Sequence, residues 1–166
     1  MTNTTIQPRA ADHARVHLDP ASILLVSAAL SVIAGGLVAA VTGPLDLTKG
    51  SWLAAYLVLV CGVGGWAVGT VQEQAAPGLS PGRAKVQLSC WLGGNAAVII
   101  GSLTSLSLVV DAGALLLATA LVIALVAAPT AAAIGRLASW GYRFLLVLLM
   151  VSVPVGSGLA HLRSAA

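Results

Sequence analysis

The sequence predicts an all-α integral membrane protein, a bundle of five transmembrane helices with a cytoplasmic N-terminus. Only 8% of the 166 residues are charged, 58% are hydrophobic, and the mean hydropathy is +0.99. A soluble domain carries about 25% charged residues, so this chain has too few polar residues to cover a water-facing surface. Long uncharged runs also alternate with short polar segments, and a run of about 20 apolar residues matches the hydrocarbon thickness of a bilayer.

The apolar runs divide the chain into three parts. Residues 1–20 form a polar tail, residues 21–160 form the transmembrane domain, and residues 161–166 form a short C-terminal tail. The five predicted spans cover about 21–41, 52–71, 88–109, 112–132 and 140–160.

The first span contains 21 residues and no charge. Asp19 and Pro20 precede it, and an acidic N-cap followed by proline is typical of the start of a helix. A secretory signal peptide is the alternative interpretation. We favour an uncleaved helix, because the run is longer than the hydrophobic region of a signal peptide and no A-x-A site closes it.

Breaker residues predict the boundaries of the next two spans. Residues 42–50 are rich in turn formers and separate the first span from the second. Residues 72–85 form the longest predicted internal loop, which contains the pairs Pro77-Gly78 and Pro81-Gly82. Such pairs interrupt helices, so we expect the third span to begin only after them.

A single acidic residue predicts the boundary between the third and fourth spans. Between Val86 and Ile134 the only charged residue is Asp111, and the stretch has the length of two membrane crossings. We therefore place a tight hairpin at residues 111–113, with Asp111 capping the fourth helix. Four spans is the alternative count, and an acidic group in an outer vestibule is the alternative role of Asp111. Pro129 is expected to end or kink the fourth helix.

The basic residues predict the orientation in the membrane. Five spans place six basic residues on the side of the N-terminus and two on the other side. The six are Arg9, Arg15, Arg83, Lys85, Arg136 and Arg143, and the two are Lys49 and Arg163. By the positive-inside rule, the N-terminus is cytoplasmic and the C-terminus lies outside. The predicted location is a cell membrane, and the Ala- and Gly-rich composition favours a bacterial inner membrane.

Aromatic residues stand near the predicted ends of the spans. Trp52 and Tyr56 lie at an outer end, and Trp91, Trp140 and Tyr142 lie at inner ends. Tryptophan and tyrosine concentrate at the level of the lipid head groups. We therefore expect these side chains to form interface belts and not a ligand cage.

Residues that commonly carry chemistry are scarce within the spans. His13 and His17 lie in the polar tail and His161 at the end of the fifth span, so no histidine is placed to ligate a haem between helices. A weak metal site at His13 and His17 is the alternative to simple solvation. No catalytic or phosphate-binding motif is present. We expect no cofactor, no metal and no enzymatic activity, and the scattered basic residues predict no nucleic-acid partner.

Asn95 is the most informative neutral residue, because it lies inside the third span. A primary amide without a partner in hydrocarbon costs a few kcal/mol. We expect it to bond to another helix, an interaction worth about 0.6–2 kcal/mol. A role in ligand binding or permeation is the alternative for Asn95.

Small residues at four-residue spacing predict where the helices pack closely. Gly65 and Gly69 form such a pair in the second span, and Gly93, Ala97 and Gly101 continue the spacing in the third. Stripes of this kind let helix backbones approach one another. We read them as evidence for a compact bundle.

Two functions remain open at this level. The favoured one is a non-enzymatic multi-pass membrane protein that acts through helix–helix contacts, such as an accessory or scaffold subunit of a membrane complex. The alternative is a small homo-oligomeric transporter or channel for a neutral or apolar solute. The direction of Asn95 discriminates between them, because a shared cavity favours transport and a close helix contact favours the scaffold. The expected partners are the lipid bilayer and other membrane subunits or further copies of the chain.

Overall fold

The computed structural model describes residues 19–74, 79–128 and 135–164, with side chains described as far as residue 152, and every regular element in these ranges is helical. The elements are α1 (Pro20–Thr42), α2 (Gly50–Tyr56), η1 (Leu57–Gly64), α3 (Gly65–Gln74), α4 (Pro81–Thr104), α5 (Ser107–Val126) and α7 (Arg136–Ser164). Four helices among the described residues are long and apolar enough to cross a membrane: α1, the continuous helix Gly50–Gln74, α4 and α5.

Helix α1 begins as the sequence predicts. The Asp19 side chain accepts a hydrogen bond from the backbone N–H of Ser22 at 3.0 Å, and Pro20 occupies the first helical turn. This cap satisfies a donor that the first turn leaves free, and the proline ring presets the helical φ angle.

The second helix contains a segment that the sequence does not predict. It begins as α2 and ends as α3, but between them η1 has π-helical hydrogen bonding over eight residues. A π-helix closes its hydrogen bonds between residues five apart and is rare in proteins. Gly62 and Gly64 lie within η1 and are buried against neighbouring helices.

Helix α4 begins earlier than predicted. Its first residue is Pro81, so Arg83 and Lys85 lie in its first turns and not in a loop that extends to residue 85. Proline has no N–H to lose at the first helical position, so Pro81 starts this helix where the sequence analysis took it as a breaker.

The turn between α4 and α5 also lies earlier than predicted. Helix α4 ends at Thr104, and Ser105 adopts a left-handed conformation with φ 59°. The N–H of Leu106 then bonds to the carbonyl of Gly101 at 2.9 Å, which closes the helix end. The hairpin at residues 111–113 is therefore wrong, but the stretch still contains two helices. The prediction failed because a serine, and not a glycine, occupies the left-handed position.

Helix α5 ends at Val126, and Ala127 follows it as the C-cap. Pro129 lies outside the described residues, as does the predicted end of the fourth span at 132. The last helix, α7, starts at Arg136, four residues before the predicted fifth span, and continues to Ser164.

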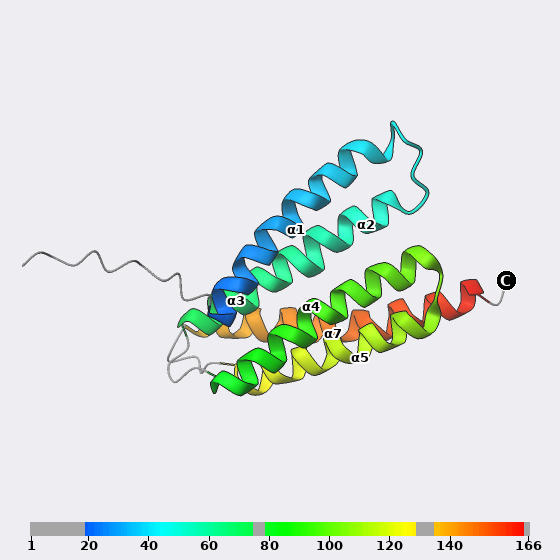
Figure 1. The fold of residues 1–166 in the computed structure, drawn as a ribbon. Helices are drawn as coiled ribbons and strands as arrows, with labels where there is room; N and C mark the ends of the chain where they lie inside the picture. The colour runs from blue at the N-terminus through cyan, green and yellow to red at the C-terminus, as the bar shows by residue number, and fades with distance from the viewer. Residues whose placement is uncertain (1–18, 75–78, 129–134, 165–166) are drawn as a thin grey trace, which may run out of the picture.

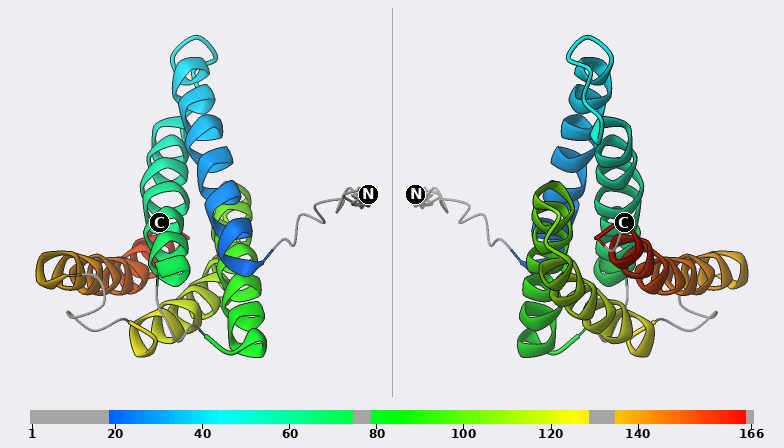
Figure 2. Two further views of the ribbon diagram at one scale, coloured as in Figure 1. Left: turned by 90° about the vertical axis from the view of Figure 1, so that its left-hand side faces the viewer. Right: turned by 90° about the vertical axis from the view of Figure 1, so that its right-hand side faces the viewer.

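The helices form two groups that meet at a shared core. In Figure 1, α1 pairs with the α2–η1–α3 helix as one hairpin, and α4 pairs with α5 as another, with α7 beside α5. The first hairpin diverges from α4 and α5 toward the α1–α2 loop, and Figure 2 shows it standing at an angle to both α5 and α7. The start of α1 and the end of α7 lie at opposite ends of the bundle (Figure 1).

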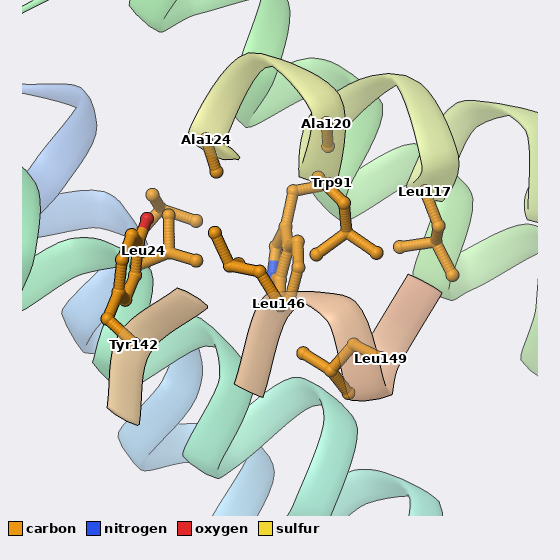
Figure 3. Close-up of a cluster of buried hydrophobic side chains, with 10 residues drawn as sticks. Leu24, Trp91, Leu117, Ala120, Ala124, Tyr142, Leu146 and Leu149 are labelled. Carbon is orange, nitrogen blue, oxygen red and sulfur yellow. The ribbon is translucent and has the colours of Figure 1, made fainter. Parts of the chain in front are cut away.

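Trp91 of α4 lies in the middle of the core. Side chains from α1, α3, α5 and α7 surround it (Figure 3), and they comprise Leu24, Val68, Leu117, Ala120, Leu121, Ala124, Tyr142, Leu146 and Leu149. Trp91 is only 3% exposed, so the prediction that it faces the lipid head groups is wrong. Its indole ring lies against Gly64 and Gly65, and a Cβ atom at Gly64 would stand only 3.1 Å from the ring.

Candidate functional site

Asn95 lies in a hydrogen-bond cluster between α4 and the second helix. Its Oδ1 accepts a hydrogen bond from the Tyr56 hydroxyl at 3.0 Å and another from the Cys61 thiol at 3.2 Å. Its Nδ2 donates to the carbonyl oxygen of Trp91 at 2.8 Å. Asn95 is 6% exposed, so these contacts replace water around a buried polar group. We call Tyr56, Cys61 and Asn95 the amide cluster.

The π-helical segment η1 explains how two residues of one helix reach the same amide. In an α-helix, residues five apart point about 140° away from each other around the axis. The π-helix instead bonds residue i to residue i+5, which places Tyr56 and Cys61 on one side. Because η1 begins directly after Tyr56 and contains Cys61, both can donate to Asn95 Oδ1.

A second contact joins the same two helices near the start of α4. Gln72 Nε2 donates to Gln87 Oε1 at 2.7 Å. Gln87 is 1% exposed, and its own Nε2 is buried without a hydrogen-bond partner. A buried donor left in this way costs about 1–3 kcal/mol, which offsets part of what the glutamine pair contributes.

A third contact lies at the opposite end of α4. Lys49, in the loop before α2, donates from Nζ to the carbonyls of Ser102 at 2.6 Å and Leu103 at 3.3 Å, and to Ser105 Oγ at 3.1 Å. The last carbonyls of a helix lack intrahelical partners and carry partial negative charge. Lys49, which belongs to the hairpin of α1 and the second helix, therefore caps the C-terminal end of α4.

These three contacts occur at three heights along α4, and we call them together the polar interface. The sequence analysis identified Asn95 but missed its partners, and it missed Gln72 and Gln87 because they lie at the edges of apolar runs. The cysteine of the amide cluster donates to an amide oxygen, which is not a base and so does not activate the thiol as a nucleophile. The arrangement is suited to holding helices together.

Asp111, the other predicted polar position, lies elsewhere. It is the fifth residue of α5, whose N-cap position is occupied by Leu106, so Asp111 does not cap this helix. The side chain is partly buried and takes part in an interaction of its own. The structure does not bring it together with Asn95 in the polar interface.

Gly65 and Gly69 of α3 face α1. A Cβ atom at Gly65 would lie 3.3 Å from Ala28 Cβ, and one at Gly69 would lie 2.9 Å from Leu25. The absence of side chains at these positions helps α1 and α3 to approach closely.

The predicted stripe in α4 faces α5 at Gly101, but at its start Gly94 and not Gly93 makes the close contact. Gly93 is exposed, and a Cβ atom there would make only an ordinary van der Waals contact, 3.9 Å from Leu116, while Ala97 is only partly buried. Gly94 is the residue in contact with α5, since its Cβ would lie 3.0 Å from the Gly113 carbonyl oxygen. Gly101 also faces α5, with the backbone nitrogen of Val110 only 2.8 Å from where a Cβ would stand.

The aromatic residues divide into a buried and an exposed set. Tyr142 is 6% exposed and belongs to the core, whereas Trp140 is 73% exposed, although both start α7. Trp52 stacks on Tyr56 with ring centroids 5.3 Å apart, which packs an indole over the amide cluster. Tyr142 therefore joins Trp91 as an exception to the expected belt.

Among the described residues, no group of three His, Cys, Asp or Glu side chains is placed to hold a metal ion, and His13 and His17 lie outside these residues. No protein-family model, no curated protein and no solved structure matches the chain. What the protein does must therefore be argued from its own geometry.

Proposed function

We propose that this protein is a non-enzymatic multi-pass membrane protein that acts through helix–helix contacts, as an accessory or scaffold subunit of a larger membrane complex. The observation that supports this most is the amide cluster. The Asn95 side chain bonds directly to groups of the neighbouring helix and of its own helix. Thr104 likewise donates back to the carbonyl of Ile100 at 2.7 Å. Polar side chains that bond to their own or a neighbouring helix favour a role in helix packing over a role in passage of a solute.

Exposed apolar side chains supply the surface for such contacts. Leu30 of α1 is 61% exposed, Leu108 of α5 80%, and Leu137 of α7 89%. In a bilayer, these faces contact either lipid or the helices of a partner. We propose that part of this surface binds other membrane subunits, and that the protein has no nucleic-acid partner.

The proposal includes a topology of five spans with a cytoplasmic N-terminus, in a bacterial inner membrane. Helix α7 is the fifth span, because its 29 residues exceed the roughly 20 that a bilayer requires. Arg83, Lys85 and Arg136 lie near the starts of α4 and α7, at the end of the bundle where α1 begins (Figure 1). This clustering supports a cytoplasmic location for that end.

Photo-crosslinking in the native membrane tests this proposal. A photoreactive amino acid replaces Leu30, Leu108 or Leu137, and each variant is irradiated in intact cells. We expect an adduct with a different membrane polypeptide from at least one of the three positions. Leu146 is the control, because it is 1% exposed on α7 and should give no such adduct. Adducts with lipid or with copies of this chain alone would contradict the subunit proposal and favour a homo-oligomeric transporter.

A further inference from the structure

The outer part of the first hairpin is separate from the core of the bundle. We call residues 36–56 the hairpin tip; they comprise the last seven residues of α1, the following loop and α2. No residue of the tip belongs to the core cluster or to the side chains packed against it. The buried residues of the tip contact their own hairpin, as Gly50 does with Thr42 and Leu47. In Figure 1 the tip is the part that diverges from α4 and α5.

Hydrogen bonds attach the tip to α4, outside the apolar core of the bundle. They come from Lys49 at the loop and from Tyr56 at the end of α2. The Lys49 bonds are exposed to solvent, so water and salt compete with them and their contribution is small. Tyr56 contacts Asn95 deeper in the interface, in a partly buried position.

The tip is followed directly by η1, the π-helical segment. Irregular hydrogen bonding within a helix is a known cause of bending. Gly62 and Gly64 within this segment are packed closely against α1, α4 and α7. Beyond η1, α3 is fixed in the core through Val68. The second helix therefore has a fixed inner part, an irregular middle and a weakly attached outer part.

We propose that the hairpin tip is a hinged arm, with η1 as its pivot and the contact of Lys49 with the end of α4 as its latch. Release of Lys49 lets the tip move away from α4, which breaks the Tyr56–Asn95 bond and opens the amide cluster. This inference concerns motion within one chain, so it does not depend on the proposed role as a subunit.

Cys61 reports the opening, because it lies in the amide cluster and is 7% exposed. The full-length protein in liposomes is treated with N-ethylmaleimide, and the labelling rate of each cysteine is measured by peptide mass spectrometry. When the tip opens and closes faster than the reagent reacts, the labelling rate of Cys61 is proportional to the population of the open form. The variant Lys49→Met removes the cation from the C-terminal end of α4. We expect this change to accelerate labelling of Cys61 about fivefold. Cys90 packs against the core and should keep its rate.

Two matched variants control this measurement. Lys49→Arg keeps a cationic donor at the end of α4 and should retain the slow rate of Cys61. Lys85→Met removes the other lysine of the chain, which lies near the start of α4, and should also leave the rate unchanged. Unchanged labelling of Cys61 in Lys49→Met, or equal acceleration of Cys61 and Cys90, would overturn the proposal.

The wild-type protein offers a second test that does not depend on the folding of a variant. Salt screens an exposed charge-assisted contact, so raising the salt concentration should loosen the latch. We expect the labelling rate of Cys61 to rise from low to high salt while that of Cys90 stays constant. A Cys61 rate that is independent of salt would count against Lys49 as the latch.

Discussion

At the scale of single residues, Asn95 illustrates what a sequence can and cannot predict. Its need for a partner follows from the cost of an unpaired amide in hydrocarbon. Its partners do not follow, because Tyr56 and Cys61 are 39 and 34 positions away and converge only through a π-helix. Trp91 was misplaced for a related reason. A tryptophan near the end of an apolar run is typical of an interface, and only the glycines of the neighbouring helix make room for it inside.

Replacement of Asn95 by leucine tests the amide cluster. The change leaves the Tyr56 hydroxyl and the Cys61 thiol without an acceptor, so we expect a loss of about 1–2 kcal/mol in stability. Thermal unfolding in mild detergent measures this loss. Thr119→Val is the matched control, because the exposed Thr119 bonds only to the carbonyl of Leu115 in its own helix. Equal melting temperatures for wild type and Asn95→Leu would refute the structural role of the amide.

The same cluster predicts energetic coupling between two positions. If the Tyr56 hydroxyl acts through Asn95, the effects of Tyr56→Phe and Asn95→Leu should not add. We expect the double variant to be more stable than the sum of the single changes implies, by about 0.5–1.5 kcal/mol. Additive losses in the melting experiment would mean that the two side chains contribute independently.

At the scale of elements, four of the five predicted spans correspond to described helices long and apolar enough to cross a membrane, and their boundaries were less predictable. Long apolar runs specify helices in a membrane, since every backbone polar group must be satisfied within the chain. The turn after α4 escaped prediction because Ser105 adopts a conformation that glycine usually marks. The choice between Gly93 and Gly94 depends on rotation about the helix axis, where one residue corresponds to about 100°. Sequence spacing alone leaves this rotation undetermined.

Neighbouring glycines of α4 provide a direct test of helix packing. In Gly94→Ala the new methyl group meets the backbone of α5 within 3.0 Å, so the helices must separate. We expect a loss of about 1–3 kcal/mol, as for other overpacked sites. Gly93→Ala places the same group at an ordinary van der Waals distance from Leu116 and should leave the melting temperature nearly unchanged or slightly higher. Equal effects of the two substitutions would contradict the assignment of the α4–α5 interface.

At the scale of the whole molecule, the all-helical class followed from composition, whereas the shape did not. The paucity of charge predicts a membrane protein, and four of the described helices are long and apolar enough to cross a bilayer. The divergence of the first hairpin from α4 and α5 depends on where small residues meet. Gly65 and Gly69 bring α3 close to α1, whereas the tip has no comparable contact with α4.

The orientation predicts which lysine is reached from outside the cell. Lys49 and Lys85 are the only lysines of the chain, and they lie near opposite ends of α4. A membrane-impermeant amine reagent should therefore label Lys49 in intact cells and Lys85 only after lysis. Labelling of Lys85 alone would invert the topology. Accessibility of Arg163 to an impermeant arginine reagent would place the end of α7 outside and support the fifth span, whereas labelling only after lysis would argue against it.

The central claim is that this protein acts as a subunit through contacts between membrane helices. The most direct test is the native mass of the tagged protein, measured by mass spectrometry after gentle extraction from its own membrane. We predict a mass that contains at least one other polypeptide, whose identity would then define the complex. A mass that corresponds to the chain alone, or to copies of it, would contradict the claim. Function would then have to be sought in transport, by flux assays on Asn95 and Asp111 variants.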